Sequence, residues 1–135
     1  MKQSYSTRYF PAAPVLEVKF ISTQTGESIG PFSALVDTGT DVTAVPMSIV
    51  QALQAPVARQ ALVEAHWGER LLVSLFTMDV NIGTWLWPGI DVIGDVHGRE
   101  VILGRDVLNR LWLGLGLDGP AQIAEVAEKR SRRKP

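Results

Sequence analysis

The chain has 135 residues, of which 46% are hydrophobic and none is cysteine. This length and composition fit one compact domain better than two, and they exclude a mainly disordered chain. The absence of cysteine excludes a disulfide scaffold, a zinc finger, an iron–sulfur protein and a thiol nucleophile. No apolar run reaches the roughly 20 residues that span a bilayer, and the N-terminus lacks the apolar segment of a signal peptide, so we expect a cytoplasmic protein with no membrane partner.

The charge is unevenly distributed along the chain. The formal net charge is −1, but five of the 13 cations lie within residues 129–135. Residues 1–128 therefore hold 8 cations against 14 anions, a net charge of −6. A basic terminal run can contact nucleic acid or an acidic partner, but it is more typical of a solvated tail, and the acidic body argues against a nucleic-acid partner.

The first part of the chain predicts a β-hairpin, a short strand and a helix. Residues 15–21 alternate between apolar and charged side chains, and the turn Gln24-Thr25-Gly26-Glu27 joins them to a strand over 31–36. A β-branched strand over 42–45 precedes Pro46, which suits the first position of a helix over 47–54. Short segments separated by glycine, proline and aspartate, without internal repeats, indicate a mostly β chain.

The remainder of the chain predicts a longer hairpin followed by further short elements. Residues 61–67 and 70–82 flank the turn Trp67-Gly68-Glu69. The other predicted elements are strands over 85–87, 90–93 and 101–103, a helix over 105–111, a last strand in which Leu113, Leu115 and Leu117 alternate with glycines, and one or two amphipathic helical turns over 121–128.

Two segments carry the residues capable of chemistry. In the first, the apolar residues 34–36 run directly into Asp37-Thr38-Gly39-Thr40. A carboxylate at the end of a buried strand is costly without a partner or a purpose, although the same tripeptide is also a common turn sequence. In the second, residues 100–108 give another buried strand, then Gly104, Arg105 and a helix start. The two segments in this order are much more specific than either alone.

Together these segments resemble the retroviral-type (retropepsin-like) aspartic proteases over roughly residues 15–117. The resemblance implies an all-β fold, a closed barrel with a flap hairpin and one short C-terminal helix. It also implies a homodimer, because each subunit of that family contributes one Asp-Thr-Gly to a shared site. Residues 1–12 would then be an N-terminal extension, residues 13–118 the protease domain, and residues 119–135 a C-terminal tail with a basic end.

The resemblance also assigns roles to individual residues. Asp37 would be the catalytic aspartate, Thr38 would link the two active-site loops across the dimer, and Gly39 would let the backbone approach the substrate. Asp41 and Arg105 would form a largely shielded ion pair. The positions implied to contact substrate are Thr40, Asp41, Val42, Trp67, Gly68 and Ile102. Leu113, Leu115 and Leu117, with the N-terminal segment, are the candidate dimer strands.

The residue types agree with hydrolysis of peptide bonds by two carboxylates. Two Asp37 side chains brought close together must share one proton, so that one activates water and the other protonates the substrate carbonyl. Neither His66 nor His97 lies in a metal-ligand pattern, so we expect no metal and no other cofactor. Thr40 follows the glycine where many viral members have alanine, and its hydroxyl can hydrogen-bond the carboxylate.

Two other functions remain open from the sequence. The chain can be a noncatalytic module that keeps this fold to bind extended peptides by strand addition or to dimerise. It can also be a protease domain used only to process its own precursor. A pure binding module has no need for Asp37-Thr38-Gly39, which favours the enzyme.

Overall fold

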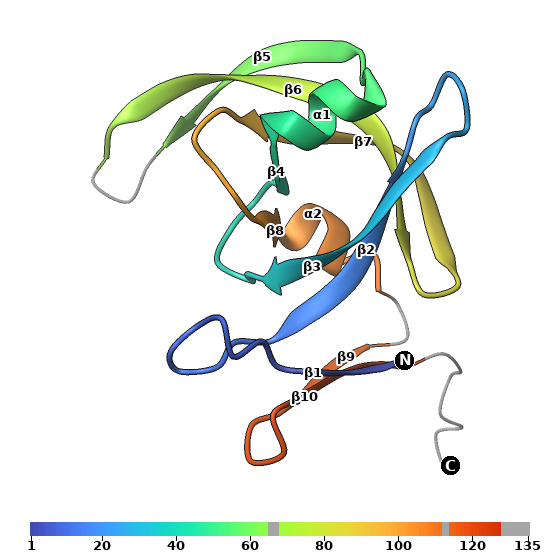
Figure 1. Ribbon diagram of the computed structural model, residues 1–135. Helices are drawn as coiled ribbons and strands as arrows, with labels where there is room; N and C mark the ends of the chain where they lie inside the picture. The colour runs from blue at the N-terminus through green and yellow to red at the C-terminus, as the bar shows by residue number, and fades with distance from the viewer. Residues whose placement is uncertain (65–67, 112–113, 128–135) are drawn as a thin grey trace, which may run out of the picture.

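The computed structural model describes residues 1–64, 68–111 and 114–127. These residues form two short helices and a set of strands arranged around one core (Figure 1). The helices are α1 (Met47–Leu53) and α2 (Arg105–Leu108). The strands are β1 (Lys2–Ser4), β2 (Val15–Ile21), β3 (Ser28–Val36), β4 (Ala44–Pro46), β5 (Val57–Glu64), β6 (Arg70–Ile82), β7 (Trp85–Asp95), β8 (Val101–Leu103), β9 (Leu115–Asp118) and β10 (Ile123–Val126). Neither helix is long and apolar enough to cross a membrane.

Six strands close into a barrel. They are hydrogen-bonded in the order β2-β3-β8-β4-β7-β6, and β2 also pairs with β6, which closes the ring. Strand β5 adds to the outer edge of β6 and forms the long hairpin. Most pairs are antiparallel, but β3 pairs with β8 in parallel, and β4 with β7. The predicted all-β, closed-barrel fold is confirmed.

The barrel is filled by the apolar face of its strands. Along β2, Leu16, Val18 and Phe20 are buried while Glu17 and Lys19 are exposed, because successive side chains of a strand point to opposite faces. The ring of Phe20 lies 6.1 Å from that of Phe32. The largest fully buried side chains are Phe20, Leu16, Met78, Ile82 and Leu103. Strands β3 and β8 pack against this core side by side, so the loops that follow them start at neighbouring points.

A small second sheet lies below the barrel in Figure 1 and joins the two ends of the chain. Its order is β1-β10-β9. The prediction of helical turns over 121–128 is wrong, because Ile123–Val126 forms strand β10. Its buried Ala124 and Val126 alternate with exposed Glu125, and pairing with two strands outweighs the helix propensity of alanine and glutamate. The segments expected as an extension and a tail thus each contribute a strand.

The strands predicted over 85–87 and 90–93 form one continuous strand, β7. Pro88 and Gly89 lie within it, where the register with β6 shifts between Met78 and Val80. Gly89 has φ +65°, and its N–H donates to Asp79 Oδ1 at 2.9 Å. A local irregularity of this kind accommodates proline and glycine without ending the strand. The observed bounds of other elements differ from the predicted ones by a few residues. Strand β5 begins earlier, β4 begins later and α2 is shorter than predicted.

Candidate active site

The site forms where two parallel strands end together. In the register of β3 and β8, Leu35 is opposite Ile102 and Val36 is opposite Leu103. Asp37 and Gly104 therefore follow neighbouring strand ends, and the Asp37 N–H donates to the Leu103 carbonyl at 3.1 Å. The two sequence segments that carry the chemistry are thus brought into contact by the barrel.

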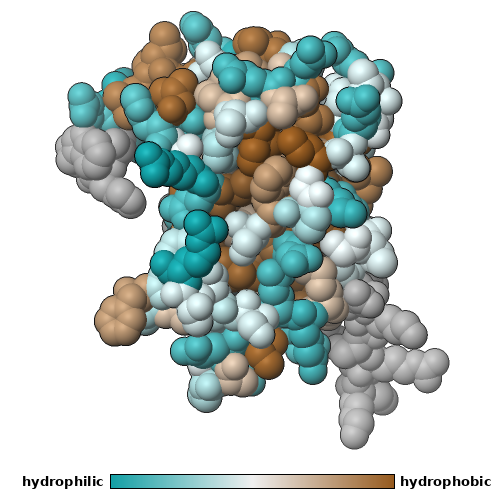
Figure 2. Space-filling model, in the orientation of Figure 1, coloured by the Kyte–Doolittle hydropathy of each residue, from teal (hydrophilic) through white to brown (hydrophobic). Residues whose placement is uncertain are grey.

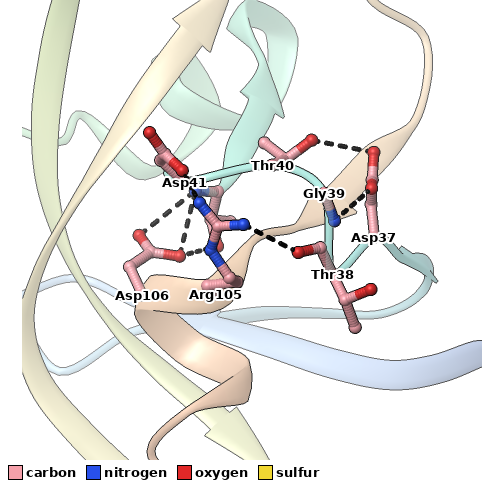
Figure 3. Close-up of polar contacts among 8 residues, drawn as sticks. Asp37, Thr38, Gly39, Thr40, Asp41, Arg105 and Asp106 are labelled. Atoms are coloured by element: carbon pink, nitrogen blue, oxygen red, sulfur yellow. Dashed lines mark hydrogen bonds and ion pairs between the residues drawn. The ribbon is translucent and has the colours of Figure 1, made fainter.

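The carboxylate of Asp37 is held by donors from its own loop (Figure 3). The Gly39 N–H donates to Oδ1 at 3.0 Å, and the Thr40 hydroxyl donates to Oδ2 at 2.8 Å. A Cβ atom at Gly39 would lie 3.3 Å from Asp37 Oδ1, so a side chain there would crowd the carboxylate. Both oxygens are therefore oriented before any substrate arrives, and the half-buried side chain remains accessible.

Thr38 lies between Asp37 and Gly39 but does not bind the carboxylate. Its side chain is exposed and points away from that of Asp37 in Figure 3. Its carbonyl accepts a hydrogen bond from Arg105 Nη1 at 3.1 Å. Arg105 thus fixes the backbone of the loop, while the Thr38 hydroxyl faces outward. The predicted link from this hydroxyl to a second subunit stays a prediction.

Asp41 and Arg105 form an ion pair, in which Arg105 Nη2 donates to Asp41 Oδ1. The expected shielding is wrong for the single chain, because the Asp41 side chain is 78% exposed and that of Arg105 is 47% exposed. The pair therefore lies on the outer surface, largely in contact with solvent. An exposed pair of this kind contributes less than about 1 kcal/mol to stability.

A buried network beneath the loop was not predicted from the sequence. The Thr43 hydroxyl donates to Asp106 Oδ1 at 2.8 Å, and both carboxylate oxygens of Asp106 also accept from the Thr43 N–H. The same hydroxyl accepts from the Gly104 N–H at 3.1 Å, and Thr43 is fully buried. The sequence feature that could have indicated this network is the position of Asp106, which directly follows Gly104 and Arg105.

Gly104 is required by the close approach of the two loops. A Cβ atom there would lie 2.8 Å from the carbonyl carbon of Val42 and 2.9 Å from the carbonyl oxygen of Thr40. Both contacts are to backbone, which cannot move aside without displacing the loop that carries Asp37. A glycine at the end of β8 thus allows the loop to pack against the start of α2.

The other residues predicted to contact substrate lie in two places, close to the Asp37 loop and on the β5–β6 hairpin. Val42 and Ile102 are half-buried close to the loop, and Ile102 lies opposite Leu35 and Ala44. Gly68 is exposed near the end of the β5–β6 hairpin and has φ +80°. Trp67 and Leu113 lie outside the described residues. Within those residues, no three His, Asp or Glu side chains gather to hold a metal ion.

Comparison with known proteins places this geometry in a recognised fold. No protein-family model and no curated protein matches the sequence. Solved structures do match. The chain is similar to a retropepsin-like aspartic protease from Rickettsia conorii, with a TM-score of 0.59 and 14% identity over 92% of this chain and 86% of that one. It is also similar to EIAV protease in complex with the inhibitor HBY-793, with a TM-score of 0.52 and 22% identity over 85% of this chain and 100% of the other.

A third similar structure is the retroviral protease-like domain of Ddi1 from Leishmania major, with a TM-score of 0.50 and 18% identity over 85% of this chain and 90% of that domain. The chain has the retropepsin fold. At these identities the likeness establishes the fold, and function has to be argued from the site. What the site offers is one oriented, accessible carboxylate per chain at the end of a buried strand.

Proposed function

We propose that the protein is an aspartic endopeptidase whose active site forms between two copies of the chain, each contributing Asp37. The observation that carries the proposal is the Asp37 carboxylate itself. It lies at the junction of β3 and β8 of a retropepsin fold, is accessible, and has both oxygens oriented by Gly39 and Thr40.

The chemistry requires a second carboxylate. Hydrolysis of a peptide bond needs a base that takes a proton from water and an acid that protonates the carbonyl oxygen. Two carboxylates a few ångströms apart cannot both ionise, so they share one proton and supply both roles at once. One chain contributes a single Asp37, and a two-fold axis beside the loop brings in the other.

Features of the surface around Asp37 support such a dimer. The Thr38 hydroxyl faces outward, and the Asp41–Arg105 pair is exposed in the single chain. A partner seated on this surface would cover both. The β5–β6 hairpin, with Gly68 near its end, is then suited to close over an extended peptide.

The test is cleavage of an unbiased peptide library by the wild-type protein and by Asp37→Asn. We expect cleavage by the wild type, unaffected by a metal chelator, and none by the variant. An amide of the same shape preserves packing but cannot share the proton, so circular dichroism and the thermal midpoint of Asp37→Asn should match those of the wild type. Equal cleavage by both proteins would refute the assignment of Asp37. Peptide binding without cleavage by either protein would favour the noncatalytic module.

A further inference from the structure

The start of α2 contacts the loop that carries Asp37 at three points. We call residues 37–43 the site loop. Three successive N–H groups donate to it: that of Gly104 to the Thr43 hydroxyl at 3.1 Å, that of Arg105 to the Thr40 carbonyl at 2.8 Å, and that of Asp106 to the Asp41 carbonyl at 3.2 Å. The conformation of the site loop therefore depends on the first turn of this helix (Figure 3).

Helix α2 is itself fixed to the core of the barrel. Its side chains Val107 and Leu108 are both buried, and Val107 is fully buried. Figure 2 shows apolar side chains in the middle of the face turned to the viewer, with hydrophilic ones around them, in the region where Figure 1 places the two helices. Burial of apolar side chains holds α2 in place independently of the site loop. The helix is therefore a fixed support on which the loop is positioned.

The carboxylate of Asp106 holds the end of the site loop. Its Oδ1 accepts from the Thr43 hydroxyl at 2.8 Å, from the Thr43 N–H at 3.1 Å and from the Val107 N–H at 2.9 Å, and its Oδ2 accepts from the Thr43 N–H at 3.1 Å. Thr43 is fully buried, so its N–H loses its acceptor if this carboxylate is removed. Asp106 thus holds the loop at Asp41 through its own N–H and at Thr43 through its side chain.

We propose that Asp106 is a positioning residue for the Asp37 carboxylate. This inference rests on the proposed function, because it concerns the same site. Between Asp37 and the two points that Asp106 holds lies Thr40, whose hydroxyl donates to Asp37 Oδ2 at 2.8 Å. Without the Asp106 carboxylate, the Thr43 end of the loop shifts and carries Thr40 with it. A catalytic group that leaves its productive geometry slows the chemical step more than it weakens the binding of substrate.

The test compares variants in the cleavage of a peptide by the full chain. Asp106→Ala removes all four hydrogen bonds of the carboxylate and should lower kcat about tenfold with little change in KM. Asp106→Asn retains an oxygen at the Oδ1 position, where three of the four bonds end, and should keep most of the wild-type kcat. The matched control is Asp91→Ala, because the half-buried Asp91 accepts a similar hydrogen bond from the Thr77 hydroxyl at 2.8 Å between β6 and β7. This control should retain the wild-type kcat.

A double-mutant cycle separates positioning from a general loss of stability. If Asp106 acts through Thr40, Asp106→Ala should lower kcat by less than about twofold in a Thr40→Ala background, since the hydroxyl that it positions is already absent. All rates are measured well below the thermal midpoint of each variant, so that the protein is folded. A tenfold loss in both backgrounds, or an equal loss in Asp91→Ala, would overturn the positioning role.

The amide signal of Gly39 in a nitrogen–proton NMR spectrum gives a readout that needs no turnover. The Gly39 N–H donates to Asp37 Oδ1 at 3.0 Å, so its proton should shift upfield when the carboxylate turns away. We expect this shift in Asp106→Ala and not in Asp91→Ala. The shift without any cleavage by the wild type would refute the endopeptidase and leave Asp106 as the residue that orients Asp37. An unchanged Gly39 signal in Asp106→Ala would refute the positioning role, whether or not the wild type cleaves.

Discussion

A single hydroxyl, that of Thr40, accounts for half of the contacts that orient the Asp37 carboxylate. Together with the Gly39 N–H, it holds the carboxylate in one orientation before a second carboxylate approaches. Two carboxylates that share a proton work only over a limited pH range, so the rate of the proposed dimer should rise and then fall with pH. Both limits belong to the pair of carboxylates.

Replacing Thr40 by alanine should lower kcat/KM about tenfold, because the Asp37 carboxylate loses one of the two donors that orient it. Thr40→Ser keeps the hydroxyl and should keep most of the wild-type rate. Sedimentation should find the same oligomer in all three proteins. A Thr40→Ala rate equal to that of the wild type would show that the hydroxyl is not needed to orient Asp37.

Thr43 contributes to the stability of the folded protein. Its buried hydroxyl donates to Asp106 and accepts from the Gly104 N–H, so Thr43→Val removes both of these hydrogen bonds. We expect a loss of about 1–3 kcal/mol in the free energy of unfolding, measured with urea. Thr43→Ser, which retains the hydroxyl, should lose less. A valine variant as stable as the serine variant would contradict the role of this hydroxyl.

The site residues that the sequence pattern itself indicated are contiguous, whereas the Asp41–Arg105 pair came from the family resemblance. Asp37 to Thr40 are consecutive, and the polar residues stand out because they follow an apolar strand. Thr43 and Asp106 are 63 residues apart and meet only because β8 inserts between β3 and β4. The exposure of the Asp41–Arg105 pair could not be predicted either. The family resemblance names the two partners, but burial depends on which other parts of the molecule cover them.

At the scale of elements, the β5–β6 hairpin can be tested through its glycine. Gly68 has φ +80° and Gly26 in the β2–β3 turn has φ +76°, and a Cβ atom at either position would have nothing within 4 Å. Alanine at either position is strained by about 1–2 kcal/mol from backbone conformation alone. We expect Gly68→Ala to lower kcat/KM several-fold because it alters the hairpin that we propose closes over the substrate. Gly26→Ala should leave kcat/KM unchanged, and an equal loss in both variants would remove the hairpin from the mechanism.

The elements that the sequence predicted well are those whose pattern matches their final surroundings. Strand β2 alternates between buried and exposed side chains from Leu16 to Phe20, so its position follows from the sequence. Strand β10 has mixed propensity, since Ile123 and Val126 favour a strand while Ala124 and Glu125 favour a helix, and it is fixed by pairing with β9 and with β1 from the other end of the chain. The continuity of β7 through Pro88 depends on the register shift in β6 opposite it. Strand β10 was decided by pairing with the other end of the chain, and β7 by a register shift in the neighbouring strand of its hairpin, so neither follows from the residues of the element alone.

At the scale of the whole molecule, the proposed two-carboxylate site needs a second chain, because each chain contributes one Asp37. Among the described residues, strand β9 pairs on one side only and lies at an edge of the small sheet, and Leu117 on it is 49% exposed, so this edge is a candidate surface for a second copy. The predicted dimer strand over Leu115 and Leu117 therefore stays a prediction, and Leu113 lies outside the described residues. An edge strand and the proposed two-carboxylate site would both be completed by assembly into a symmetric pair.

Mixing wild-type chains with Asp37→Asn chains tests whether catalysis needs two copies. If the site forms across a two-fold axis, a mixed dimer holds only one ionisable Asp37 and is inactive. After exchange at a fixed total concentration, activity should fall as the square of the wild-type fraction, to about one quarter in an equal mixture. Lys19→Ala chains, altered on the exposed face of β2, keep Asp37 and serve as the control, so mixing them with the wild type should leave the activity unchanged. A linear fall, to about one half in the equal mixture, would place the complete catalytic site within one chain and end the dimeric mechanism.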